Sequence, residues 1–278
     1  MPDKTITDKI DFSKSEQYTL SIRLSTDGFS FSIYNPISDS SFCYIPLGIK
    51  SELPMAVNVK DIFQRLDFLQ HPYKRINVLS VNHRFTLIPF EVFDEEQTED
   101  ILYQNHPKQE NEIVLYNILK RANTVTTFSM DKSVHQLLEE QFNTVYFYSQ
   151  ASPLIEYFAG KSRIGNSKKM YAYLRDNSLE IYCFDRGKLM LANSFNCNKT
   201  EDRMYYILYI WEQLNFSQER DELHFTGLLK DKGDIILQLN KYLKQVFVIN
   251  PKSEFNNSEL TKIEDIPFDL QALFLCEL

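Results

Sequence analysis

The stretch LSIRLSTDGFSFSIYN, residues 20–35, is the most regularly patterned part of the chain and decides the fold prediction. Apolar and polar side chains alternate on both sides of a Thr-Asp-Gly turn, and a period of two across a short Asp-Gly turn is typical of a β-hairpin. The apolar positions are Leu20, Ile22, Leu24, Phe29, Phe31 and Ile33. Hydroxyl groups, an acid and a glycine crowd the turn, so it either holds a phosphate group or only connects two strands.

A second stretch, residues 169–195 (KMYAYLRDNSLEIYCFDRGKLMLANSF), repeats this pattern with polar turns at 176–178 and 185–187. Each patterned stretch is followed by a helix and a further strand. In the order of the chain, these are a helix at 61–71, a strand at 75–82, a helix at 201–216 and a strand at 222–227. Internal repetition of this kind predicts a duplicated βββαβα unit.

Two such units predict a two-lobed α/β protein in which helices cover mixed sheets. We expect a flexible leader at residues 1–16, a first lobe at 17–165 and a second lobe at 166–278. Ligands prefer clefts between domains, so an interlobe cleft is the predicted ligand site.

The segment between the two hairpins also shows regular patterns. It contains strand patterns at 112–119 and 124–130, and a helix follows with Ser129 or Asp131 as its cap. An apolar segment at 266–275 predicts a closing helix.

Composition excludes several classes of protein. The 278 residues are 43% hydrophobic and 14% aromatic, which is enough for a sizeable core. The net charge of -8 supports solubility and disfavours a nucleic-acid binder, which needs a basic face. The mild basic cluster at 160–169 is interpreted as a solvated linker.

The four cysteines have no CxxC spacing, so neither a zinc site nor a redox motif is predicted. Cys43 and Cys183 lie among apolar residues of predicted strands, and we expect both to be reduced and buried. The polar start has no signal-peptide core, and no window approaches the ~20 apolar residues of a membrane span. A reducing cytoplasm is the expected location.

The duplicated unit resembles the actin-like ATPase architecture, which is shared by actin, heat-shock chaperones, sugar kinases and pilus-assembly actin homologues and has ribonuclease H-like lobes. Residues 17–278 as a whole resemble a Bacteroidetes family, a domain of unknown function with this fold. The hairpins at 20–36 and 172–195 carry the resemblance and are specific as a pair.

The resemblance implies a nucleotide site built from three elements. The first phosphate loop places Arg23 where an Asp would hold magnesium, and the second places Tyr173 or one of its neighbours at the corresponding acidic position. The third element is an apolar strand beneath the adenosine. The candidate contacts are Ser25, Thr26, Asp27, Gly28, Asn177, Ser178, Thr226 and Gly227, with no catalytic residue and no metal ligand assigned.

The chain departs from this site in the chemistry that nucleotide binding needs. Phosphate-cradling loops present backbone N–H groups in conformations open mainly to glycine, and the chain has only seven glycines. Leu228 replaces the second glycine expected after Gly227. An Arg at the acidic position repels magnesium, although a guanidinium can bind phosphate directly.

Other chemistry-bearing motifs give weaker signals. The five histidines have no HxH or HExxH spacing, and the chain has no GxSxG or Walker-type loop. Tyr205, Tyr206, Tyr209 and Trp211 share one predicted helix. They form either core and amphipathic rim or, if several lie exposed, a surface for a protein partner.

These observations predict a non-catalytic interaction or scaffold protein with degenerate nucleotide-binding loops. It needs no cofactor and binds an unidentified protein partner, and a homodimer is left open. The alternative is a divergent ATPase or small-molecule kinase that binds ATP and magnesium in the interlobe cleft. In that alternative Asp27 and Asp176 are the turn acids nearest the phosphates.

Overall fold

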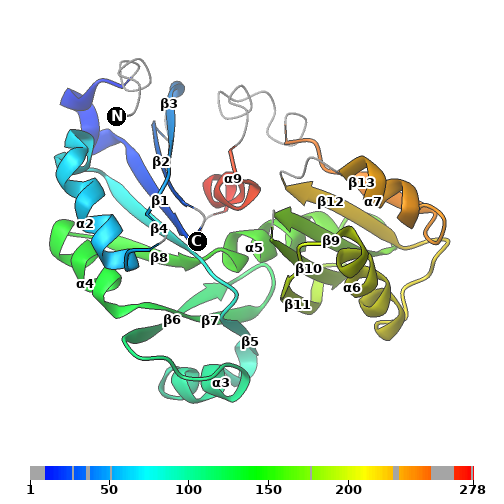
Figure 1. Cartoon of the computed structure of the whole chain (residues 1–278). Helices are drawn as coiled ribbons and strands as arrows, with labels where there is room; N and C mark the ends of the chain where they lie inside the picture. The colour runs from blue at the N-terminus through cyan, green and yellow to red at the C-terminus, as the bar shows by residue number, and fades with distance from the viewer. Residues whose placement is uncertain are drawn as a thin grey trace. The chain divides into compact units, whose positions relative to one another are not determined.

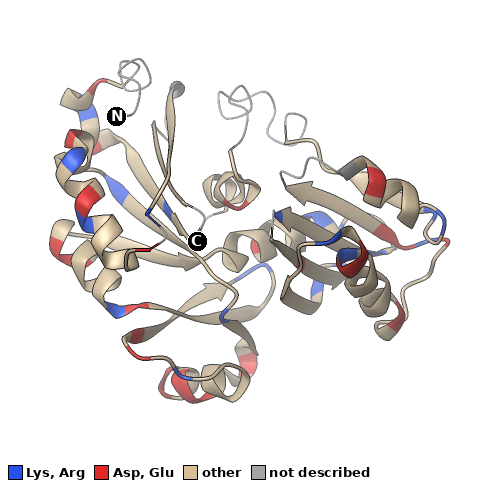
Figure 2. Ribbon diagram, viewed as in Figure 1, with Lys and Arg blue, Asp and Glu red and all other residues tan. Residues whose placement is uncertain are grey.

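A computed structural model describes residues 10–26, 28–35, 38–50, 52–175, 177–227, 232–251, 266–276 and 278 (Figure 1). The chain forms two compact units. Unit 1 contains Met1–Asn117, Val125–Ser152 and Asn257–Ile266, and unit 2 contains Ile118–Thr124, Pro153–Asn256 and Pro267–Leu278. The predicted lobes follow chain order, whereas these units interleave along the chain. Lys and Arg are interspersed with Asp and Glu in both (Figure 2).

Unit 1 is built on a five-stranded sheet of order β3-β2-β1-β4-β8. The strands are β1 (Thr19–Ser25), β2 (Gly28–Asn35), β3 (Ser38–Leu47), β4 (Arg75–Val81) and β8 (Val145–Ser149). The first three are antiparallel neighbours, and β4 runs parallel to both β1 and β8. The predicted hairpin is confirmed, because Ser25 pairs with Gly28 at its turn.

The core of unit 1 follows from the alternation in the sequence. The apolar residues of β1 and β2 share one face of the sheet, because successive side chains of a strand point to opposite faces. They pack with α2 (Met55–Arg65) and α4 (Lys132–Gln141), and Cys43 is buried among them as expected. Each fully buried aliphatic or aromatic side chain stabilises the fold by about 1.5–3 kcal/mol.

Unit 2 repeats the strand order of unit 1 as β11-β10-β9-β12-β13, so the predicted duplication is confirmed. The strands are β9 (Lys168–Arg175), β10 (Ser178–Asp185), β11 (Lys188–Asn196), β12 (Glu222–Gly227) and β13 (Gln245–Val248). Helices α6 (Thr200–Gln213) and α7 (Lys232–Leu239) cover one face, where Cys183 is buried as expected.

The other face of this sheet is aromatic. Phe158 of α5 (Ala151–Ser162) stacks on Tyr171 with ring centroids 4.2 Å apart. Phe268 of α9 (Phe268–Leu275) stacks on Phe158 and lies against Tyr173. The sheet of unit 2 is therefore buried on both faces.

Unit 1 carries an insertion between β4 and α4. It forms a three-stranded sheet of order β5-β7-β6 together with α3 (Thr98–Asn105). Its strands are β5 (Phe85–Pro89), β6 (Glu112–Leu119) and β7 (Thr124–Asp131), with η3 (Phe90–Val92) and η4 (Glu95–Gln97) between β5 and α3. In unit 2 the described chain between β12 and β13 contains α7 alone.

Two local predictions differ from the structure. Part of the predicted flexible leader is folded. Residues Phe12–Gln17 form the 3₁₀ helix η1, and the Phe12 ring stacks on His71. The helix predicted at 61–71 begins earlier, at Met55, and ends at Arg65, followed by η2 (Asp67–Gln70). Within the described residues, no helix is long and apolar enough to cross a membrane.

Candidate functional site

The first predicted phosphate loop is the β1–β2 turn. Ser25 ends β1 and is buried, whereas Thr26 is exposed in the turn; Asp27 lies outside the described residues. Gly28 opens β2 with φ +149°, and a Cβ atom there would lie 2.9 Å from the carbonyl oxygen of Leu47. The close approach of β3 thus accounts for this glycine without a ligand.

Arg23 occupies the position at which the actin-like architecture would hold magnesium. Its side chain is 8% exposed, and it pairs across the hairpin with the buried Ser30. Both residues line a cavity of about 330 Å³ together with Gly28 and Tyr44. A buried cation therefore stands where the resemblance implies a carboxylate.

The second predicted phosphate loop is a buried ion-pair site. Tyr173 is 2% exposed and pairs across β10 with the fully buried Glu180. A guanidinium nitrogen of Arg175 lies 2.9 Å from Glu180 Oε1, and the Tyr182 hydroxyl donates to Oε2 at 2.6 Å. Burial raises the pKa of Tyr182 well above its usual value, so this phenol remains a hydrogen-bond donor.

The remaining candidate contacts lie at the same end of neighbouring strands in unit 2. Asn177 is exposed in the β9–β10 turn beside the buried Ser178, and Asp176 lies outside the described residues. Thr226 and Gly227 end β12, where Gly227 pairs with Leu174 of β9. The structure therefore brings the second and third elements together within unit 2.

Gly227 is required by the backbone geometry of this edge. Its φ is +101°, in the region that side chains rarely adopt, and a Cβ atom would lie 2.1 Å from the carbonyl oxygen of Leu174. Thr226 is buried, and its Oγ1 has no hydrogen-bond partner within the described part of the chain. The close approach of β9 therefore explains Gly227, which the resemblance places beneath the adenosine.

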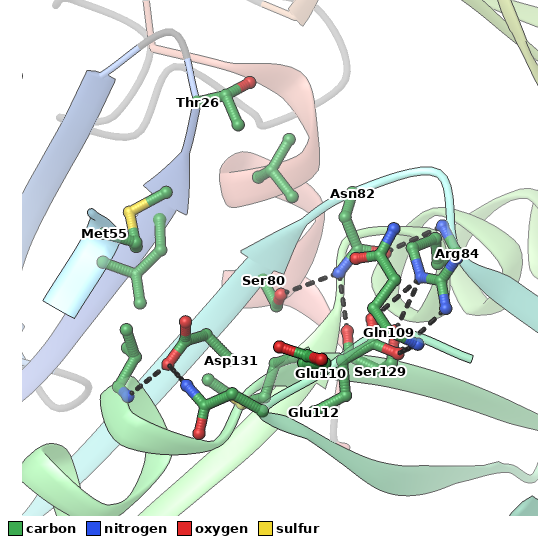
Figure 3. A pocket seen from close by; sticks show the side chains of 15 residues that line it. Thr26, Met55, Ser80, Asn82, Arg84, Gln109, Glu110, Glu112, Ser129 and Asp131 are labelled. Carbon is green, nitrogen blue, oxygen red and sulfur yellow. Dashed lines mark hydrogen bonds and ion pairs between the residues drawn. The ribbon is translucent and has the colours of Figure 1, made fainter. Parts of the chain in front are cut away.

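Unit 1 contains a second polar cavity, of about 220 Å³, at the carboxyl ends of β1 and β4 (Figure 3). In α/β sheets, ligands bind outside the carboxyl ends of the parallel strands. Thr26 of the predicted phosphate turn lines this cavity together with Met55, Arg84 and Glu110. Its lining combines a predicted contact residue, Thr26, with both acidic and basic side chains.

An ion pair joins the strands of the inserted sheet beside this cavity. Arg84 Nε lies 2.9 Å from Glu112 Oε1, and Arg84 Nη2 lies 2.9 Å from Oε2. The Ser129 hydroxyl donates to Oε1 at 3.0 Å, and Asn82 Nδ2 donates to the Ser129 carbonyl at 2.8 Å. Figure 3 shows these groups on one wall of the cavity. Because Glu112 neutralises Arg84, the acids left on the lining are Glu110 and Asp131.

Asp131 has a structural role, as predicted from the sequence. Its Oδ1 accepts the Val134 N–H at 3.0 Å and caps α4, and it also accepts Asn111 Nδ2 at 3.2 Å. A carboxylate at this position complements the helix dipole. The cavity is thus bounded by a capped helix and a neutralised ion pair.

Sequence reasoning missed Asn82, Arg84, Glu112 and Ser129. The polar residues that directly follow the apolar strand β4 were the available signal, since polar groups at the carboxyl ends of parallel strands gather at ligand sites. The partner Glu112 lies 28 residues further along the chain, and no local pattern connects it to Arg84.

Three histidine side chains take part in ring packing or local hydrogen bonds. His106 Nε2 donates to the Phe85 carbonyl, His135 stacks on Phe147, and His224 lies 2.8 Å from Glu222 Oε2. Among the described residues, no group of three His, Cys, Asp or Glu side chains is placed to hold a metal ion. The described lining of the Figure 3 cavity contains neither histidine nor cysteine.

The duplicated strand order and the paired hairpins define the class: this is a protein of actin-like ATPase fold. A crystal structure of a Bacteroides thetaiotaomicron protein with actin-like ATPase fold and unknown function is 54% identical to this chain. The match covers 96% of this chain and 99% of that one, with a TM-score of 0.87. PilM in the PilM–PilN type IV pilus biogenesis complex shares the fold at 13% identity, covering 92% and 97% of the two chains with a TM-score of 0.52.

The family follows from the sequence match. Residues 7–246 fit the model of the family described as protein of unknown function DUF3822, and the chain belongs to that family. No curated protein matches the chain.

Proposed function

We propose that this chain is a non-catalytic interaction protein, a scaffold that keeps the actin-like fold without its nucleotide chemistry. The observation that carries the proposal is Arg23, which is buried at the position where the resemblance implies a magnesium-holding acid. Magnesium binds through carboxylate, phosphate and water oxygens in near-octahedral geometry. A guanidinium at that position repels the metal and supplies no ligand atom.

The phosphate-cradling elements support the same conclusion. Tyr173 replaces the corresponding acid in unit 2, and Arg175 at the end of β9 is paired with Glu180. Strand contacts account for two glycines of the implied site, Gly28 in the first hairpin and Gly227 at the end of β12. Side chains in place of glycines block the close backbone approach that a phosphate needs.

The fold is compatible with partner binding. The PilM structure of the same fold is a complex with a second protein, PilN. By analogy of fold alone, we propose that this chain also acts by holding a protein partner.

The test is a titration of ATP, ADP and GTP, each with magnesium, into the full chain by calorimetry, together with an assay of phosphate release. We expect no binding at micromolar nucleotide and no turnover. Micromolar affinity with measurable turnover would overturn the proposal and favour the ATPase or kinase alternative.

A control separates intrinsic hydrolysis from contamination. Asp27 is the turn acid that the alternative places nearest the phosphates in the first lobe. If hydrolysis is detected and Asp27→Ala leaves its rate unchanged, that assignment fails and a contaminating enzyme becomes the explanation. If Asp27→Ala abolishes hydrolysis, the non-catalytic proposal is wrong.

A further inference from the structure

The solvent face of α6 presents two stacked tyrosines. Tyr205 is 61% exposed and Tyr209 is 48% exposed, and their rings are nearly parallel with centroids 5.8 Å apart. On the opposite side of the helix, Ile207 and Trp211 are buried against the sheet. One side of this helix therefore belongs to the core, and the other side presents exposed aromatic rings.

The aromatic surface continues from the helix onto the edge strand β11. Tyr206 stacks on Phe195 of β11 with centroids 4.2 Å apart, and it meets Tyr205 edge-on at 5.5 Å. These four residues, Phe195, Tyr205, Tyr206 and Tyr209, form one contiguous row, called here the tyrosine row. Tyr205 and Tyr209 are exposed, whereas Phe195 and Tyr206 are half-buried and pack against the core beneath them. Exposed aromatic rings supported in this way are enriched at protein interfaces.

Carboxylates flank the tyrosine row. Glu201 lies one helical turn before Tyr205, Asp202 lies three residues before it, and Glu212 lies three residues after Tyr209. All three are exposed, and within the described residues none forms an ion pair. Figure 2 shows acidic positions in red on α6.

The cations of this helix do not neutralise the rim. Arg203 points inward and donates to the carbonyls of Arg175 at 2.9 Å and Cys197 at 3.2 Å. Lys199 precedes the helix as its N-cap residue, at the opposite end from Glu212, so one lysine stands beside a helix with three exposed carboxylates. The rim keeps a net negative charge.

We propose that the tyrosine row is the docking surface for a basic protein segment whose arginine or lysine side chains stack on the exposed rings and pair with the flanking carboxylates. Guanidinium groups are attracted to the faces of tyrosine rings, and complementary charge around an aromatic centre steers the encounter. An anionic partner such as nucleic acid meets repulsion from the same rim. The inference rests on the proposed interaction function and names its surface and partner chemistry.

The probe is a capped peptide of alternating Gly and Arg, with a matched peptide in which Glu replaces Arg. Each is labelled and titrated into the full chain by fluorescence anisotropy. We expect the Arg peptide to bind and the Glu peptide not to bind. The double variant Tyr205→Ala/Tyr209→Ala should weaken Arg-peptide binding by about tenfold or more, because two ring contacts are lost.

Two further variants separate ring contacts from charge. Glu201→Gln/Asp202→Asn/Glu212→Gln should weaken binding and flatten its salt dependence, because exposed charge interactions are screened by salt. Tyr242→Ala is the matched control, since Tyr242 is an exposed tyrosine of the same unit outside the row. It should leave binding unchanged. The substituted side chains are all exposed, and circular dichroism verifies that each variant is folded.

Three results would overturn the inference. They are no binding of the Arg peptide to the unmodified chain, equal binding by the Tyr205→Ala/Tyr209→Ala variant, and concentration-dependent self-association that this variant abolishes. The last result would assign the surface to a second copy of the chain. Magnesium-ATP turnover tests the proposed function separately, so loss of one conclusion can be told from loss of the other.

Discussion

The five-stranded sheets of the two units have the same strand order and matching registers, yet they place their charged side chains differently. Arg23 pairs with Ser30 in unit 1, and the corresponding pair in unit 2 is Tyr173 and Glu180. At the start of the next strand, Arg75 in β4 corresponds to Glu222 in β12.

This comparison separates what the backbone requires from what the side chains add. The ladder hydrogen bonds are made by the main chain and tolerate many side chains, so duplication preserves the sheet. Buried charges must each find a partner, and each sheet has done so with different residues. The polar faces have therefore diverged while the fold has stayed the same.

The largest effect is expected at Glu180, because its carboxylate is fully buried between Arg175 and Tyr182. Glu180→Ala should lower the free energy of unfolding by about 3–5 kcal/mol, since it leaves a buried cation without its partner. The matched change in unit 1, Ser30→Ala, should cost less than about 1 kcal/mol, because the Ser30 hydroxyl has no hydrogen-bond partner within the described residues. Urea unfolding of both variants measures the difference, and equal losses would contradict the comparison.

A smaller loss is expected at Gly227, whose counterpart in unit 1 is Ser80. Gly227→Ala should lower the free energy of unfolding by about 2–4 kcal/mol, because its backbone conformation is strained for alanine and the Leu174 carbonyl must move. Gly48→Ala is the control, since no atom lies within 4 Å of its added Cβ. Thermal unfolding that shows the same shift for both variants would refute the close-packing explanation.

The smallest effect is a pH dependence that only one sheet should show. Burial tends to raise the pKa of Glu222, but hydrogen bonds from Lys169, Ser167 and His224 outweigh it and lower the pKa below its ordinary value of 4.5. A lowered folded-state pKa stabilises the fold above the unfolded pKa, and this contribution is lost as the pH falls through the folded-state value. Because solvent screens this partly exposed group, we expect less than about 1 kcal/mol.

Denaturant titrations from neutral pH to pH values below 4.5 test this expectation. The difference in free energy of unfolding between the unmodified chain and Glu222→Gln should narrow as the pH falls. Arg75→Gln in unit 1 should cost the same at each pH, because Arg75 donates to the Asn77 amide oxygen and the Tyr148 hydroxyl, and neither partner is a carboxylate. A pH-independent difference at Glu222 would show that its carboxylate is not held by these hydrogen bonds.

The backbone could be predicted because its signals are local. Alternation across a turn specifies a hairpin over about a dozen residues, and both hairpins were found in this way. The same alternation was misleading about burial. Polar residues such as Ser21, Ser32 and Glu180 occupy positions that alternate with the core, which usually indicates a solvent face, yet all three are buried.

The candidate site was less predictable, because its contacts join distant parts of the sequence. Arg84 and Glu112 meet across strands of the inserted sheet, and the sequence offers no pattern that pairs them. The exposure of Tyr205 and the burial of Trp211 depend on which side of α6 meets the sheet. The residue types left both core and interface open, and the structure shows which side of the helix is exposed.

The interleaving of the two units has a consequence for synthesis on the ribosome. Residues 118–124 belong to unit 2 but are made before β8 completes the sheet of unit 1. The backbone N–H groups of Arg121 and Ala122 donate hydrogen bonds to the Glu156 carboxylate, and Glu156 is synthesised 35 and 34 residues later, respectively. At translation rates of 5–20 residues per second, this segment waits roughly 2–7 s for its partner. Unit 2 must therefore assemble around a segment that has already emerged within the sequence of unit 1.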